Sequence, residues 1–141
     1  MHSILTTFAT YISKAVFCGR MYFVAQYPGV IASDSEDDMV FGEVYALTTN
    51  PQRNNLVWKI LDEYEGNDGT EYALYIRKKF DVFLLEDSSA NIGPAFGEST
   101  ISLHHLSQSS EPLQAWVYCY NRSIEALERI ETGDFAHPFV A

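Results

Sequence analysis

The sequence predicts an α+β fold, and three observations lead to this prediction. Four segments have the composition or the apolar alternation of β-strands. One segment has the caps and the apolar spacing of an amphipathic helix. The length of 141 residues suits one domain with a single core. We therefore expect one domain over residues 1–141, without internal repeats or a linker.

The first part of the chain is expected to contain two strands. Residues 3–12 are predicted to form a weak, short helix at most. Residues 15–24 are rich in β-forming side chains, and Gly19 interrupts them, which is typical of a bulge or of a bend in a barrel. Residues 27–29 (Tyr-Pro-Gly) are expected to form a turn. Residues 39–48 alternate with the period of a strand.

The clearest helix of the sequence lies between Asn50 and Gly66. Asn50 is a favourable N-cap, and Pro51 is favourable at the first helical position. Gly66 is expected to end the helix. Between them, apolar residues recur at helical spacing: Leu56, Val57, Ile60, Leu61 and Tyr64.

The second half of the chain is expected to alternate between strands and irregular segments. Residues 72–85 are predicted to form one long strand or a bent pair. Residues 86–111 lack apolar periodicity and are predicted to be an inserted loop with at most a short strand around 100–106. Residues 113–120 are almost continuously apolar, which indicates a central, buried strand. A last helical segment is expected at 123–131, ending before Gly133.

Charge and hydropathy exclude several classes of function. The net charge of −10 argues against nucleic-acid binding, which depends on clustered lysine and arginine. The acidic run at 34–38 lacks the pattern of a calcium loop and is expected to be a solvated turn. No apolar run approaches the roughly 20 residues that cross a bilayer, and the N-terminus lacks the basic start of a signal peptide. We therefore expect a cytoplasmic protein without a membrane partner.

Glu65 is the strongest candidate for acid/base chemistry. It ends a group of three carboxylates, with Asp62 and Glu63, at the end of the helix where the macrodipole disfavours negative charge. Asp62 and Glu63 are expected to face solvent, whereas Glu65 follows Leu61 by one turn and so lies near the apolar stripe. Burial there would raise the pKa of Glu65 toward the range of a general acid or base. The alternative is an exposed side chain at a frayed helix end.

Other reactive residues give weaker signals. Cys18 and Cys119 lie in apolar strand segments without a nearby histidine, which indicates buried, unreactive thiols. His104 and His105 lack acidic or cysteine partners at metal-ligand spacing, so no metal site is predicted. Tyrosines are dense enough on the predicted strands to line a pocket, although strand tyrosines are more often simply packed.

Seven short motifs follow one another along nearly the whole chain. They are Gly19-Arg20-Met21-Tyr22, Tyr27-Pro28-Gly29, Gly42-Glu43-Val44-Tyr45, Leu61-Asp62-x-Tyr64-Glu65-Gly66, Tyr75-x-Arg77, Ala115-Trp116-Val117-Tyr118-x-Tyr120-Asn121 and Ile130-x-x-Gly133-Asp134-Phe135. Each is weak alone, but their order resembles the γ-glutamylcyclotransferase-like (AIG2-like) family.

This resemblance implies a fold, a reaction and a set of site residues. The fold would be a small, mixed, closed or nearly closed β-barrel with short flanking helices. The reaction would release 5-oxoproline and a free amine from a γ-glutamyl amine or peptide, without a cofactor, and with Glu65 as the acid/base residue. The motifs also supply the candidate substrate-binding residues: Tyr27, Pro28, Gly29, Arg77 and Tyr120. The sequence does not identify the released amine.

The chain departs from the family pattern at its start. The family usually opens with a Tyr-Gly-Thr-Leu strand, whereas residues 1–5 here resemble the helix that follows it. Either the chain begins downstream of that strand, or it closes its sheet in another way. We expect residues 15–24 to be left as a bare edge, which a second copy covers in a homodimer or residues 1–14 cover. The alternative function is a non-catalytic member that serves as a binding or interaction module.

Overall fold

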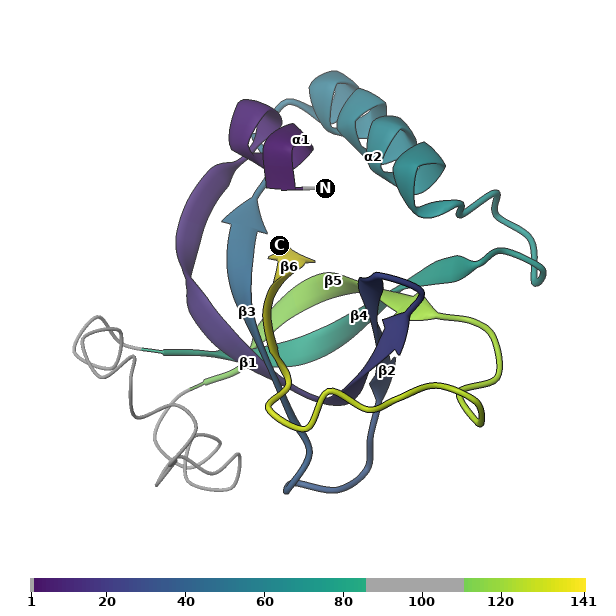
Figure 1. The fold of residues 1–141 in the computed structure, drawn as a ribbon. Coiled ribbons are helices and arrows are strands. Elements are labelled where there is room, and N and C mark those ends of the chain that lie inside the picture. Colours follow the sequence, from purple (N-terminus) through teal and green to yellow (C-terminus); the bar gives the residue numbers. More distant parts are fainter. Residues whose placement is uncertain (1, 86–110) are drawn as a thin grey trace.

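The computed structural model describes residues 2–85 and 111–141, which form a β-barrel with two helices on the same side (Figure 1). The elements are α1 (His2–Phe8), β1 (Thr10–Val24), β2 (Tyr27–Ala32), β3 (Met39–Ala46), α2 (Pro51–Glu65), β4 (Tyr75–Leu84), β5 (Leu113–Tyr120) and β6 (Asp134–Val140). In the described part of the chain, neither helix is long and apolar enough to span a membrane.

The sheet closes on itself through its longest strand. The strand order is β2-β1-β3-β6-β5-β4, and additional pairings join β1 to β4 and β2 to β5. The pairs β3–β6 and β2–β5 are parallel and the other pairs are antiparallel, so the barrel is mixed. At Gly19, β1 exchanges β3 for β2 as its partner, so a bend typical of a barrel lies where the sequence indicates one. These observations confirm the predicted α+β barrel.

Residues 15–24 are not a bare edge, so that expectation is wrong. Residues 10–18 of β1 pair with β3, residues 19–24 pair with β2, and residues 15–17 also pair with β4. Further along, β1 is covered by backbone hydrogen bonds from Ile130 N to Met21 O (2.7 Å) and from Phe23 N to Glu128 O (2.9 Å). The homodimer stays a prediction, but this edge no longer supports it.

Two local predictions are also corrected by these pairings. Residues 27–29 begin β2 rather than forming a turn, because the chain reverses at Ala25 and Gln26, where Ala25 has a φ of 55°. Residues 123–131 are not a helix. Arg129 forms a bridge with Tyr22 of β1, and Ile130 is buried in the barrel core, so long-range pairing overrides the local helical pattern.

The remaining elements follow the predicted order. The strand expected at 72–85 is one strand, β4, and the strand expected at 113–120 is β5 with the same bounds. The helix expected at 3–12 is shorter and ends at Phe8. The inserted loop predicted at 86–111 lies, except for its last residue, outside the described residues.

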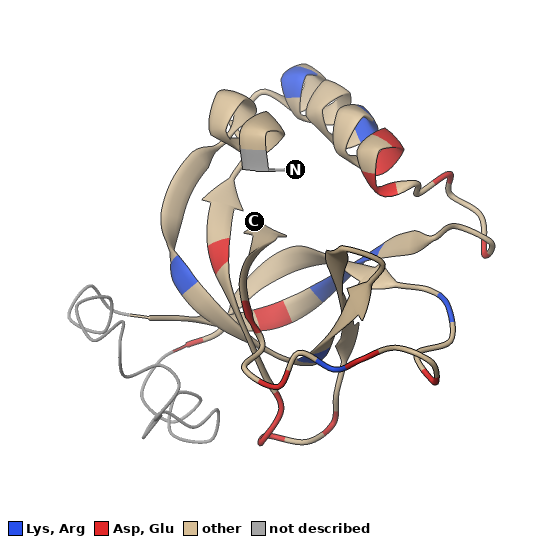
Figure 2. Ribbon diagram, in the orientation of Figure 1, with Lys and Arg blue, Asp and Glu red and all other residues tan. Residues whose placement is uncertain are grey.

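Asp38 departs from the solvated turn expected at 34–38. Its side chain accepts hydrogen bonds from Ser33 Oγ (2.6 Å), Arg20 Nε (2.7 Å) and Arg129 Nη2 (2.8 Å). These hydrogen bonds hold the pKa of Asp38 well below its usual range, and the bond from Ser33 has the largest effect. In the acidic β2–β3 connection of Figure 2, Asp38 therefore joins β1 to the segment before β6.

One buried cluster fills the barrel, and another fixes the helices relative to it. The larger cluster fills the barrel and includes Phe17, Met21 and Phe139. The second cluster joins α1 and α2 to β3, β5 and β6 through six buried residues: Leu5, Tyr45, Val57, Leu61, Tyr118 and Val140. Because Val57 and Leu61 belong to this cluster, the C-terminal end of α2 is held against the barrel.

Candidate active site

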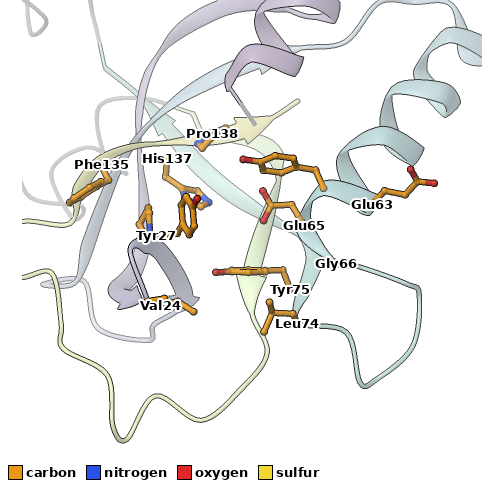
Figure 3. Close-up of a pocket in the computed structure, with 13 residues that line it drawn as sticks. Val24, Tyr27, Glu63, Glu65, Gly66, Leu74, Tyr75, Phe135, His137 and Pro138 are labelled. Atoms are coloured by element: carbon orange, nitrogen blue, oxygen red, sulfur yellow. The ribbon is translucent and has the colours of Figure 1, made fainter.

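A pocket of about 720 Å³ lies where the end of α2 meets the barrel. Its walls come from the end of α2, the start of β4, the β1–β2 turn and β6 (Figure 3). A volume of this size falls within the range of about 300–1,000 Å³ that is usual for small-molecule sites.

Local sequence signals place Glu65 at this pocket. The Asn50 side chain accepts hydrogen bonds from Gln52 N (3.0 Å) and Arg53 N (3.1 Å), which caps the first turn of α2 as predicted. Gly66 ends the helix in the left-handed conformation, with a φ of 69°. Glu65 is therefore the last helical residue, one turn after the buried Leu61, and it faces the barrel.

The carboxylate of Glu65 points into the pocket, whereas that of Glu63 points away (Figure 3). Burial raises the pKa of Glu65 above its ordinary value. The ring of Tyr75 lies beside it, and burial together with the charge of Glu65 raises the pKa of Tyr75 to about 12. At neutral pH the site thus combines a carboxyl group with a shifted pKa and a neutral phenol.

The structure brings together only some of the predicted site residues. Tyr27 and Pro28 line the pocket with Glu65. Gly29 and Tyr120 lie next to each other beside the pocket, because a Cβ at Gly29 would lie 3.3 Å from Cβ of Tyr120. Tyr120 in turn contacts Tyr75, with ring centroids 5.6 Å apart.

Arg77 lies outside the pocket, in a shallow polar depression beside α2. Its Nη2 is 3.3 Å from Oδ2 of Asp62, and its guanidinium lies 3.9 Å from the ring centroid of Trp58 and 5.1 Å from that of Trp116. This arrangement holds Arg77 against two indole rings that are in contact with each other, rather than in the pocket with Glu65.

Sequence reasoning missed the contribution of β6. Phe135, His137 and Pro138 line the pocket, and His137 is buried. A proline inside a strand is a sign of an unpaired strand edge. One edge of β6 pairs with β3, and in this pairing Pro138 lies opposite Glu43. Pro138 could therefore have indicated that the segment from Phe135 to Pro138 is a strand with one unpaired edge, which is open to a ligand.

Asp62 is not simply solvent-facing, which corrects the expectation. Its side chain is 23% exposed, and its Oδ1 accepts a hydrogen bond of 2.6 Å from the hydroxyl of the buried Tyr118. Burial, and then the hydrogen bond to Asp62, raise the pKa of Tyr118. Asp62 thus ties the last turns of α2 to β5, three residues before Glu65.

We expect Tyr118→Phe to lower the free energy of unfolding by about 1–2 kcal/mol, because it removes a buried hydrogen bond to a charged acceptor. Asp62→Ala should cost about 2–3 kcal/mol, because it leaves the buried hydroxyl without its acceptor. Urea unfolding of both variants and of the double mutant measures the coupling, which should be about 1 kcal/mol or more. Tyr72→Phe, at an exposed tyrosine, is the control. Additive losses would contradict a direct bond.

The comparisons with known proteins agree with this geometry. A family model described as "Gamma-glutamyl cyclotransferase, AIG2-like" matches residues 1–137. Comparisons with curated proteins and with solved structures gave no match. The family match extends over nearly the whole chain and confirms the resemblance that the seven motifs indicate. The chain belongs to the AIG2-like gamma-glutamyl cyclotransferase family.

Proposed function

We propose that the protein is a γ-glutamylcyclotransferase-type enzyme that converts a γ-glutamyl amide into 5-oxoproline and a free amine. The observation that carries this proposal is the pocket carboxylate of Glu65, with its raised pKa, in a chain of this family. The substrate is a small molecule, and the reaction requires no redox step.

The reaction is an intramolecular acyl transfer. The α-amine nitrogen of the γ-glutamyl group attacks its own γ-carbonyl carbon and forms the five-membered lactam. The bond between that carbon and the amide nitrogen then breaks. Glu65 takes a proton from the α-ammonium group and delivers it to the departing nitrogen, so the carboxylate is regenerated. Because nucleophile and electrophile belong to one molecule, the main task of the pocket is to hold one folded conformer.

Tyr75 is suited to assist this reaction. Its hydroxyl points into the pocket on the same side as the Glu65 carboxylate (Figure 3). With a pKa of about 12 it keeps its proton at neutral pH. In our proposal it donates a hydrogen bond to the oxygen that becomes negative in the tetrahedral intermediate. Tyr27 and Pro28 form the opposite wall that limits the conformers of the substrate.

One observation favours the alternative of a binding module. Among the described residues that line the pocket, none is lysine or arginine, so neither an ammonium nor a guanidinium side chain is available there for the α-carboxylate. Binding of a γ-glutamyl amide without product formation would be the result expected for such a module.

The direct test is to incubate the protein with γ-glutamyl amides and to quantify 5-oxoproline and free amine. We expect the two products in equal amounts. We also expect kcat/KM to rise with pH as Glu65 ionises, with a midpoint above its ordinary pKa of 4.5. An α-N-acetylated γ-glutamyl amide is the control, because its nitrogen cannot attack. Calorimetric binding without release of either product would contradict catalysis and support the binding module.

A further inference from the structure

Exposed apolar side chains are concentrated at the mouth of the pocket. Among the described residues, Tyr27, Tyr64, Leu74 and Phe135 are large hydrophobic side chains that are 41–63% exposed, and all four line it. Apolar surface that stays in contact with water in a concave site is available to a ligand. The ring of Phe135 is also held in place, because it packs edge-on against Phe23 with centroids 5.7 Å apart.

Part of the apolar lining, Phe135, Leu74 and Val24, lies at a distance from the reacting group. In Figure 3, Phe135 lies across the pocket from Glu65, while Val24 and Leu74 lie on the side of Tyr75 that faces away from Glu65. The volume of about 720 Å³ leaves room for more than the γ-glutamyl group. A second part of the ligand would therefore contact this apolar wall while the scissile amide lies near Glu65.

The described residues that line the pocket include no lysine or arginine that could pair with a second carboxylate. The acidic residues among the described lining residues are Glu63, whose carboxylate points away, and Glu65, whose carboxylate points into the pocket. Strand β2 carries no charged residue and β6 carries only Asp134, as Figure 2 shows. Arg77 is engaged with Asp62 and Trp58 outside the pocket. Apart from the imidazole of His137, an anionic leaving group would meet the carboxylate of Glu65 and mostly apolar side chains, with no lysine or arginine among the described lining residues.

We propose that the amine released by this protein is apolar and carries no carboxylate, and that it is bound against Phe135, Leu74 and Val24. This inference rests on the proposed function, because it concerns the same pocket and reaction. The substrate is then a γ-glutamyl amide of a simple aliphatic or aromatic amine rather than a γ-glutamyl amino acid. The apolar wall contributes by removing the body of the amine from water.

A substrate series tests this specificity. We expect kcat/KM for γ-glutamylbenzylamide and γ-glutamylisobutylamide to exceed that for γ-glutamylglycine and γ-glutamylglutamate by tenfold or more. The γ-glutamyl derivative of 1,4-diaminobutane should also be a poorer substrate than the benzylamide, because its second ammonium group would lose its hydration against the apolar side chains of Phe135, Leu74 and Val24. Equal or better turnover of the glycine, glutamate or diaminobutane derivative would overturn the inference and leave the proposed function standing.

Binding measurements separate this inference from the proposed function. If none of these compounds releases 5-oxoproline, the proposed function fails, and calorimetry with the same compounds then decides the inference. We expect the benzylamide to bind at least tenfold more tightly than the glycine derivative. Equal Kd values would overturn the inference.

Variants of the apolar wall give a second, independent result. Phe135→Ala should lower kcat/KM for the benzylamide about tenfold and change that for the glycine derivative little, while Phe135→Arg should raise turnover of the glycine derivative. Tyr72→Ala is the matched control, because Tyr72 is a 74% exposed aromatic residue outside the pocket. A loss of similar size for both substrates in Phe135→Ala, at unchanged melting temperature, would overturn the proposal.

Discussion

Replacing Glu65 with glutamine is expected to lower the rate of 5-oxoproline release by about 10²–10⁴-fold, the usual contribution of a general acid/base residue. Glutamine has nearly the same shape as glutamate, so the pocket keeps its volume, but it cannot take a proton from the α-ammonium group. Binding of the γ-glutamyl amide should change much less than kcat, because the substituted group acts mainly in the transition state. Steady-state kinetics with quantified 5-oxoproline measures both values.

The same substitution should not destabilise the fold at neutral pH. Burial raises the pKa of Glu65 in the folded protein above 4.5. Its contribution to stability is therefore complete below pH 4.5 and is lost as the pH rises through the folded-state pKa. Glutamine stays neutral throughout, so at pH 7 Glu65→Gln should unfold at the same or a higher urea concentration than the wild type.

Glu63→Gln is the control for both measurements, because Glu63 belongs to the same helical turn but its carboxylate points away from the pocket (Figure 3). We expect it to retain turnover. Wild-type turnover in Glu65→Gln would remove Glu65 from the mechanism. Loss of turnover together with a large loss of stability would indicate a structural role instead.

The helix that carries Glu65 could be predicted because its signals are local. Asn50, Pro51 and Gly66 specify the two ends of α2 through hydrogen bonds and backbone conformations within a few residues. Of the residues at apolar spacing, Val57 and Leu61 are buried whereas Leu56 and Tyr64 are exposed, and Glu65 lies one turn after Leu61 at the edge of the core.

The rest of the site depends on contacts between distant residues. The segment 123–131 has a helical pattern, but the bond from Ile130 N to Met21 O holds it against β1. Similarly, Asp62 has the sequence environment of an exposed helical residue, yet Tyr118, 56 positions later, donates a hydrogen bond to it. No local pattern encodes such partners, and so the strand-like course of residues 123–131 and the role of Asp62 were not predicted.

Gly42 is a position where the barrel leaves no room for a side chain. It lies opposite His137 in the parallel β3–β6 pair, next to a shift in register. A Cβ at Gly42 would collide with the carbonyl oxygen of His137 and would lie 2.6 Å from a ring carbon of the fully buried Phe139. The first of these atoms belongs to the backbone, so no change of rotamer can move it away.

We therefore expect Gly42→Ala to lower the free energy of unfolding by about 2–3 kcal/mol, as overpacking in a dense core does. Whether the substitution lowers or raises the free energy of unfolding distinguishes a steric clash from an effect on the unfolded chain. At a glycine with ordinary φ and free space, alanine usually stabilises by about 0.4–1 kcal/mol, because it restricts the unfolded chain. Here the steric cost should exceed that gain. Urea unfolding at pH 7 measures the difference, and turnover should fall as well, because β6 carries His137 and Pro138 into the pocket.

Two further variants separate the steric cause from other effects. Gly69→Ala meets no heavy atom within 4 Å, but Gly69 has a φ of 81°, so this variant should lose only the cost of a left-handed conformation, about 1–2 kcal/mol. Adding Phe139→Leu to Gly42→Ala relieves the contact with the ring but not the one with the His137 carbonyl. The double mutant should therefore stay less stable than Phe139→Leu alone. If Gly42→Ala is as stable as the wild type, or if Phe139→Leu removes its whole effect, then the β3–β6 backbones are not in close contact at Gly42, and this wall of the pocket is placed differently.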